Sequence, residues 1–224
     1  MITDILIDLD NTLIDFNACV KISMRELFPE YGLVFKDEYF DTFLEINNDL
    51  WRKIERGELT KTHFREIRWN TIFNKIGLEC DGIAFEKEFE KGIAEGTEPV
   101  EGAVELLSYL HKKYRIHIVT NGFTETQKHR LEKGGYAEYI DSVFVSESFG
   151  VQKPQKGFFD CCFGLLGDVR PENCVLIGDS LSADISGGVS YGIKTVWFNR
   201  GGENAGDIRP DHTVTSLSEI FNIL

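Results

Sequence analysis

Several acidic side chains, a lysine and a threonine follow short apolar runs in this sequence, where they could take part in one reaction. These residues are Asp8, Asp10, Thr120, Lys153, Asp179 and Asp184. The carboxyl ends of parallel strands meet at one edge of a sheet, which is where ligands bind in open α/β folds. We therefore expect the six side chains to form a single site.

The chemistry of this set is consistent with transfer of a phosphoryl group. Several carboxylates in one cleft repel each other unless a hard divalent cation neutralises them, and a set of oxygen ligands without soft donors favours Mg²⁺. Asp8 and Asp10 are separated by one residue, so one can attack phosphorus while the other transfers protons to and from oxygen. Lys153 would balance the developing charge, and Thr120, with Asn121 and Gly122 beside it, would bind a phosphoryl oxygen.

Each piece has a simpler explanation when it is taken alone. An Asp-x-Asp near a strand end is commonly a turn, and Thr120-Asn-Gly122 is commonly a tight turn. Gly178-Asp-Ser is commonly a loop with a helix cap. Only the combination, in this order and at successive strand ends, is specific for catalysis.

Alternating strands and helices are expected to position these residues. Short β-branched runs begin at Ile5, Ile116, Ser142, Cys174 and Lys194 and predict five buried strands. The expected helices are 101–114, 124–133, 156–166, 183–190 and 216–223, the last starting with a capping box, Ser216 to Glu219. The alternation predicts an α/β, Rossmann-like core in three layers, with a parallel sheet covered by helices on both faces.

One long interval interrupts the alternation. Ile14 to Gly96 is far longer than the roughly 10–12 residues that a crossover between parallel strands requires. It contains nine of the 17 Phe and two of the three Trp, enough to bury a core of its own. Apolar residues recur there at helical spacing. We expect a cap domain of about four helices at 16–96, inserted into a catalytic core of 1–15 and 97–224.

Composition narrows the class of protein further. The 224 residues carry a formal net charge of −13, which argues against nucleic acid or an anionic membrane as the main partner. The five cysteines show no metal-binding spacing and are typical of reduced thiols. No signal peptide and no apolar run of membrane-spanning length is expected, so the sequence predicts a cytoplasmic protein. It does not predict an oligomeric state.

The motifs resemble those of the haloacid dehalogenase-like hydrolase superfamily. The resemblance is carried by Asp8-Leu-Asp-Asn-Thr-Leu13, Thr120-Asn121, Lys153-Pro154 and Gly178-Asp-Ser-Leu-Ser-Ala-Asp184. It implies that Asp8 is the nucleophile, Asp10 the general acid and base, and Thr120 and Lys153 the phosphate contacts. It further implies that Mg²⁺ is bound by Asp8, the Asp10 carbonyl and Asp179, with Asp184 supporting the metal ligands.

The same residues separate branches of that superfamily. The dehalogenase branch needs neither a metal nor an acid two residues after the nucleophile, so the presence of Asp10 and Asp179 disfavours it. Phosphonate hydrolysis is disfavoured because that branch lacks an acid at the position of Asp10.

A closer resemblance is to the pyrimidine nucleoside 5′-monophosphatases. It rests on Asn47-Asn-Asp-Leu-Trp51, Glu55-Arg-Gly-Glu-Leu-Thr60, Thr120-Asn-Gly-Phe123 and Ser146-Glu-Ser-Phe-Gly150. It implies UMP, dUMP or dTMP as substrate, with Asn47 and Phe123 as candidate substrate contacts beside Asn121 and Gly122. Asn47 could equally be a satisfied polar group between cap and core, and Phe123 a packing residue.

Two other functions remain open at this point. A sugar-phosphate or phosphoglycolate phosphatase, or a phosphomutase, would use the same core with a different cap. A non-catalytic phosphate-responsive module is the alternative outside enzymes. The long insert and Asp10, neither of which signalling requires, favour a small phosphorylated metabolite that is turned over.

Overall fold

The computed structural model describes all 224 residues and divides into two compact units. The core unit comprises Met1–Asp15 and Thr97–Leu224, and the helical unit comprises Phe16–Gly96. The helical unit is thus one continuous segment that interrupts the chain of the core unit shortly after its first strand.

The core unit is built on a six-stranded parallel sheet in the order β3-β2-β1-β4-β5-β6. Its strands are β1 (Asp4–Ile7), β2 (Arg115–Thr120), β3 (Ser142–Val145), β4 (Cys174–Gly178), β5 (Lys194–Phe198) and β6 (His212–Val214). The chain proceeds outward from β1 to β3 and then returns to the other side of β1 with β4. The order therefore reverses at β1, the place where α/β sheets bind ligands.

The central strands are largely apolar because both faces of the sheet are covered. All four residues of β1 and all five of β4 are buried. Ile7 at the end of β1 lies opposite Ile118 of β2 and Ile177 of β4. This register sets the residues that follow the three strands side by side.

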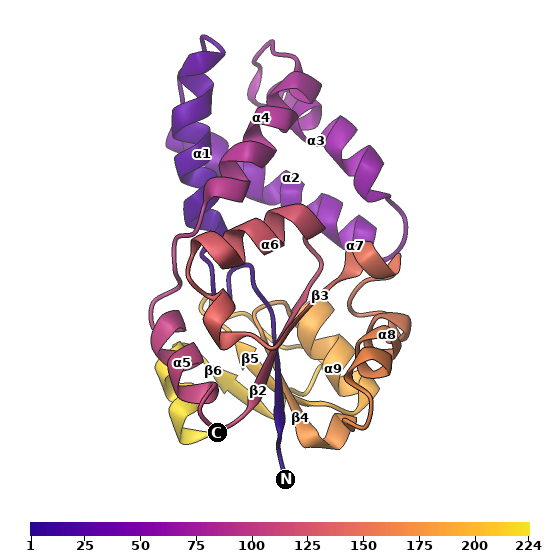
Figure 1. Cartoon of the computed structure of the whole chain (residues 1–224). Coiled ribbons are helices and arrows are strands. Elements are labelled where there is room, and N and C mark those ends of the chain that lie inside the picture. The colour runs from indigo at the N-terminus through magenta and orange to yellow at the C-terminus, as the bar shows by residue number, and fades with distance from the viewer. The chain divides into compact units, whose positions relative to one another are not determined.

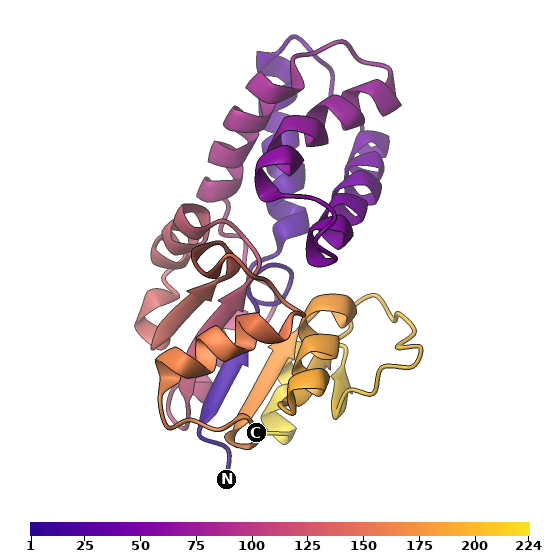
Figure 2. The ribbon, with the colours of Figure 1, turned by 90° about the vertical axis from the view of Figure 1, so that its right-hand side faces the viewer.

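Helices lie on both sides of the sheet, with α5 and the C-terminal segment on one side and α8 and α9 on the other (Figures 1 and 2). The helices of the core unit are α5 (Ala103–Leu110), α6 (Thr124–Lys133), α7 (Ser146–Phe149), α8 (Lys156–Leu166) and α9 (Ser186–Tyr191). The other helical segments are the 3₁₀ helices η1 (Ala137–Tyr139), η2 (Pro171–Asn173) and η4 (Leu217–Asn222) and the π-helix η3 (Leu181–Ile185). Leu6, Val119 and Leu176 of the sheet pack with Phe158, Phe159 and Cys162 of α8 in one apolar cluster.

The core unit has one strand more than the sequence predicted. β6 consists of only His212, Thr213 and Val214 at the edge of the sheet, and only Val214 is buried. A segment of only three residues carries too little periodicity to be recognised as a strand. The expected C-terminal helix is the 3₁₀ helix η4, and its capping box between Ser216 and Glu219 is present.

The helical unit contains α1 (Phe16–Glu30), α2 (Asp37–Glu55), α3 (Lys61–Ile76) and α4 (Gly82–Glu95). Aromatic rings fill its interior. The Trp69 ring lies 4.3 Å from that of Phe85, 5.0 Å from that of Phe89 and 5.6 Å from that of Phe43, measured between centroids. Thr60 and Asp81 cap the first turns of α3 and α4 by accepting backbone N–H groups. The unit therefore has a core of its own.

A buried ion pair crosses this aromatic interior. The Arg68 guanidinium donates to both carboxylate oxygens of Glu86, at 3.0 and 2.5 Å, and to Oδ1 of Asn47 at 3.1 Å. All three side chains are buried, and Arg68 also lies over the rings of Phe64 and Phe89. Asn47 thus has a protein partner inside the helical unit.

None of the helices combines the length and the apolar character that crossing a membrane would require.

Candidate active site

The site begins where β1 ends. Asp8 directly follows β1, and its N–H donates to the carbonyl of Ile177 at 2.9 Å, which extends the pairing with β4 by one residue. The residue is 7 % exposed. Beyond it the chain turns sharply, with Asn11 in the left-handed region at φ 58°, a conformation that asparagine tolerates better than most residues. Asp10 therefore lies in the turn and not on the extended strand that positions Asp8.

Lys153 joins two of the carboxylates. Its ammonium donates to Oδ1 of Asp8 at 2.7 Å, to Oδ1 of Asp184 at 2.6 Å and to the carbonyl of Val119 at 2.6 Å. These three bonds use all the donors that an ammonium has. The lysine is 2 % exposed, so its charge lies in the interior and is held there by the acids.

Asp179 and Asp184 come from the segment after β4. Asp179 directly follows the strand, its N–H donates to Oγ1 of Thr12, and that hydroxyl donates to Oδ1 of Asp179. The Asp184 carboxylate accepts the N–H of Ser180 at 3.1 Å. A Cβ at Gly178 would lie 2.3 Å from Oδ2 of Asp184, so glycine is needed at this point for the carboxylate to fit.

The three carboxylates fit a divalent cation. Ligand oxygens of Asp8, Asp179 and Asp184 all lie within 4.8 Å of one another. Against three carboxylates the site has the single ammonium of Lys153, which leaves an excess of negative charge in a buried place. Hard oxygen donors in this number suit Mg²⁺ better than a soft metal. The Asp10 side chain lies outside the cluster, and its carbonyl as a ligand stays a prediction.

Burial controls the titration of these groups. It raises the pKa of Asp179 to about 7, with Asp184 adding to the shift. It also raises the pKa of Asp8 well above the usual range, although Lys153 opposes the shift. Burial alone would lower the pKa of Lys153, but the charges of Asp184 and Asp8 outweigh it and raise that pKa. The lysine therefore stays charged. Its single positive charge does not balance the three carboxylates.

Thr120 is the last residue of β2, and its hydroxyl forms two hydrogen bonds. Oγ1 accepts the N–H of Gly122 at 3.1 Å and the Nε2 of Gln127 at 2.9 Å. A hydroxyl has two lone pairs and one proton, so Thr120 keeps its O–H for donation. That O–H can donate to an anion at the ends of the strands.

Asn121 is directed to the backbone of Lys153. Its Nδ2 donates to the Lys153 carbonyl at 2.9 Å, and its Oδ1 accepts the Lys153 N–H at 3.0 Å. The asparagine therefore fixes the loop that carries the lysine. Phe123, which precedes α6, is partly buried.

Asp10 is held by helix α6. Oδ1 accepts from Nη1 of Arg130 at 2.5 Å, and Oδ2 accepts from Nε2 of Gln127 at 2.6 Å. Gln127 and Arg130 are each 1 % exposed, whereas the Asp10 side chain is 29 % exposed. Sequence reasoning missed both residues of α6. The sequence gives no signal for them, because polar residues on a short helix usually face solvent, and only the structure shows that both lie on the buried face with Leu131.

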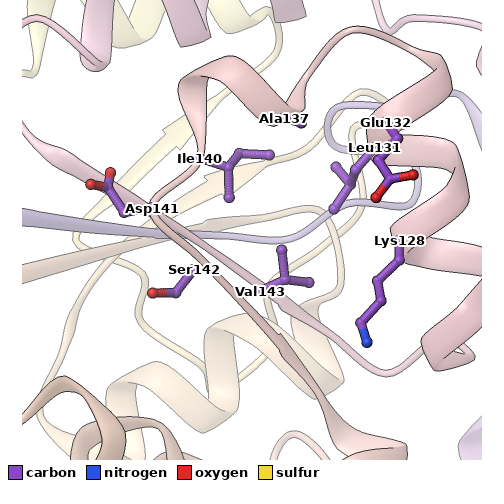
Figure 3. Close-up of a pocket in the computed structure, with 8 residues that line it drawn as sticks. All are labelled: Lys128, Leu131, Glu132, Ala137, Ile140, Asp141, Ser142 and Val143. Carbon is purple, nitrogen blue, oxygen red and sulfur yellow. The ribbon is translucent and has the colours of Figure 1, made fainter.

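A surface groove elsewhere shares no residue with the site. It is lined by Lys128, Leu131, Glu132, Ala137, Ile140, Asp141, Ser142 and Val143. Figure 3 shows the apolar side chains Leu131, Ile140 and Val143 around it, with Lys128 and Glu132 on one side. Its volume of about 260 Å³ is below the roughly 300–1,000 Å³ of typical ligand pockets. The carboxylate cluster remains the candidate site.

Known proteins resemble this chain in sequence and in structure. A family model described as haloacid dehalogenase-like hydrolase matches residues 5–198. The chain is 34% identical to the HAD hydrolase YfnB of Bacillus subtilis over 98% of this chain and 94% of that one. A crystal structure of YfnB bound to magnesium matches with a TM-score of 0.94 at 33% identity, covering 100% of this chain and 98% of that chain.

Two further relatives have named substrates. Pyrimidine 5′-nucleotidase PynA of Streptococcus pneumoniae is 32% identical, over 98% of this chain and 94% of its own length. N-acylneuraminate-9-phosphatase of Homo sapiens is 39% identical, over 88% of this chain and 83% of its own length.

Proposed function

Because the chain belongs to the haloacid dehalogenase-like hydrolase family, we propose that it hydrolyses phosphate monoesters through a phosphorylated Asp8. The observation that carries the proposal is the convergence of Lys153 on Asp8 and Asp184, with Asp179 within 4.8 Å. A buried acid with an adjacent charged lysine and two further acids is suited to binding a cation and a phosphoryl group together.

The reaction proceeds in two displacements. In the first, a carboxylate oxygen of Asp8 forms a bond to phosphorus while the bond to the leaving oxygen breaks, and Asp10, which enters this step protonated, gives that oxygen its proton. In the second, Asp10 takes a proton from water, whose oxygen attacks the phosphorus, and the bond to Asp8 breaks. Phosphate is released and both aspartates return to their starting states.

The remaining residues stabilise charge and orient the phosphoryl group. The Lys153 ammonium and the Thr120 hydroxyl face the charge that develops on the phosphoryl oxygens. Mg²⁺ would be held by Asp8 and Asp179 with Asp184 in support, and when bound it neutralises the acids and polarises the phosphoryl group. Asn121 keeps Lys153 in place through the backbone bonds described above.

Of the expected substrate contacts, Phe123 stays in the proposal as a residue beside the site. We give Asn121 and Gly122 supporting roles because the Asn121 amide is bonded to Lys153 and the Gly122 N–H to Thr120. Asn47 likewise has Arg68 as its partner. In this proposal the helical unit, inserted after β1, is the cap domain.

The substrate that we propose is a pyrimidine nucleoside 5′-monophosphate. Sequence similarity to PynA over almost the whole chain supports this choice, together with the segments around Asn47 and Phe123. The likeness to a sugar-phosphate phosphatase supports a second candidate, a phosphorylated sugar. Membership in a hydrolase family sets aside a purely binding function.

A panel of phosphorylated metabolites separates the two candidates. UMP, dUMP and dTMP would be compared with sugar phosphates and phosphoglycolate by release of inorganic phosphate at fixed Mg²⁺. We expect the highest kcat/KM among the pyrimidine nucleotides. Faster turnover of a sugar phosphate would replace the nucleotide assignment, and absence of release from every ester would overturn the phosphatase assignment itself.

A further inference from the structure

Two side chains of α6, Gln127 and Arg130, connect the proposed proton-transfer group to the proposed phosphate-binding hydroxyl. Gln127 Nε2 donates to Oδ2 of Asp10 at 2.6 Å and to Oγ1 of Thr120 at 2.9 Å. Arg130 Nη1 donates to Oδ1 of Asp10 at 2.5 Å and to Oε1 of Gln127 at 3.1 Å. These bonds connect four residues of the core unit.

The network has only one consistent orientation. Arg130 has donors and no acceptor, so the atom of Gln127 that faces it must be the amide oxygen. The amide nitrogen of Gln127 must then face Asp10 and Thr120. The arginine therefore determines which way the glutamine amide points, and the glutamine determines where the Asp10 carboxylate and the Thr120 proton lie.

Burial makes the arrangement rigid. Gln127 and Arg130 are three residues apart on α6, so they share one face of the helix, and both are almost fully buried. An always-charged guanidinium in such a place needs hydrogen-bond acceptors, and Asp10 and Gln127 are two of them. A Cβ at Gly122 would lie 2.2 Å from Nε2 of Gln127, so the amide fits only because residue 122 has no side chain.

We infer that Gln127 and Arg130 are positioning residues for hydrolysis, which set the Asp10 carboxylate and the Thr120 hydroxyl relative to the substrate. The inference rests on the proposed function. Arg130 acts through Asp10 and Gln127, whereas Gln127 acts on both Asp10 and Thr120. The two residues therefore differ in the part of the reaction that they control.

The acidity of the leaving group separates proton transfer by Asp10 from binding of the phosphoryl group by Thr120. Phenol is a poorer leaving group than 4-nitrophenol and depends more on a proton from Asp10, whereas binding of the phosphoryl group by Thr120 is common to both esters. The value of kcat/KM reports steps up to leaving-group departure, so hydrolysis of the phosphoenzyme does not obscure it. A series of aryl phosphates therefore measures proton transfer apart from phosphate binding.

The experiment compares Arg130→Met, Gln127→Leu and Asp10→Asn with wild type on that series. Misplacing a general acid forfeits part of the about 10²–10⁴-fold that it contributes, so we expect Arg130→Met to lose roughly 10- to 100-fold more on phenyl phosphate than on 4-nitrophenyl phosphate. Gln127→Leu should show the same dependence of kcat/KM on the leaving group. It should also lose kcat/KM by an equal factor on all esters, because Thr120 is misplaced as well. In the Asp10→Asn background, Arg130→Met should add no further dependence on the leaving group.

Controls separate positioning from folding. Lys128→Ala, an exposed neighbour on α6, should match wild type on every ester. Arg130→Lys keeps the charge and should recover part of the activity that Arg130→Met loses on phenyl phosphate. Thermal unfolding and Mg²⁺ titration verify that each variant is folded, and if Arg130→Met does not fold, Gln127→Leu and Arg130→Lys carry the test.

The outcomes are distinct. Equal losses on all esters for both Arg130→Met and Gln127→Leu, or no loss, would overturn the inference and leave the proposed function intact. Wild type that hydrolyses none of the aryl phosphates would instead overturn the proposed function.

Discussion

At the scale of residues, the site is held together by one ammonium among three carboxylates. Lys153 contacts Asp8 and Asp184 directly, whereas Asp179 is bonded to Thr12. Asp179 is therefore the acid of the cluster with no cationic hydrogen-bond partner, and burial has raised its pKa to about 7. Its protonation should be visible in the stability of the metal-free protein.

Replacing Asp179 by Asn should change how stability depends on pH. An acid whose pKa is raised on folding favours the folded state fully below its unfolded pKa, here 3.8, and loses that contribution as pH rises towards about 7. With a chelator present, Asp179→Asn should therefore gain stability relative to wild type across this interval. Thermal unfolding of both proteins over the interval measures the difference.

Asp168→Asn is the matched control, because this aspartate is exposed and outside the site. This variant removes one carboxylate without touching the carboxylate cluster, so its unfolding measures what the loss of a surface carboxylate contributes. A gap between Asp179→Asn and wild type that does not change with pH would show that Asp179 titrates like an ordinary aspartate.

At the scale of elements, the loop after β2 and helix α6 depend on each other. A methyl group at residue 122 would lie 2.2 Å from Nε2 and 2.8 Å from Cγ of Gln127, so this buried side chain would have to shift. We expect Gly122→Ala to lose some stability, because the shifted Gln127 gives up buried hydrogen bonds, and to lose roughly tenfold or more in kcat/KM, because the moved amide no longer holds Thr120 and Asp10. Kinetics and thermal unfolding of the same preparation provide both values.

Gly164→Ala in α8 serves as its control, since a Cβ there would meet nothing within 4 Å. Alanine is favoured over glycine inside a helix by about 1 kcal/mol, so this variant should be as stable as wild type or more so, with full activity. If Gly122→Ala were equally active, the link from the loop to α6 would lose its support.

A second prediction at this scale concerns the ion pair inside the helical unit. Arg68→Met leaves Glu86 buried without its cation and should destabilise by about 3–5 kcal/mol. The double variant Arg68→Met with Glu86→Leu removes both charges and should recover much of that loss. Chemical denaturation of the two variants tests this, and a double variant as unstable as Arg68→Met would contradict it.

The site residues at the strand ends could be predicted from the sequence because each directly follows its strand along the chain. A buried strand followed by acids, a threonine or a glycine is a continuous pattern, so the positions of Asp8, Thr120 and Asp179 could be read directly. The partners of Asp10 and Asn47 could not, because Gln127, Arg130 and Arg68 are polar residue types that usually lie on surfaces. Only the packing of a helix shows that such a side chain is buried and paired.

At the scale of the whole molecule, the chain consists of two units with separate cores. Residues 16–96 form four helices around Trp69 and its aromatic neighbours, and their core is made of their own side chains. We expect this segment, expressed alone, to be helical and to unfold cooperatively. Circular dichroism during thermal unfolding tests this, with Trp69→Ala as the variant that should abolish the transition, since loss of a buried Trp costs about 3–5 kcal/mol.

The central claim, that Asp8 becomes phosphorylated, is tested most directly by trapping the intermediate. The enzyme would be mixed with 4-nitrophenyl phosphate and Mg²⁺, quenched in acid within the first turnover and analysed by intact-protein and peptide mass spectrometry. The account predicts one added phosphoryl group per chain in the peptide that contains Asp8, and none in Asp8→Asn or with a chelator. Steady turnover without any phosphorylated protein, or a phosphoryl group on another residue, would contradict it.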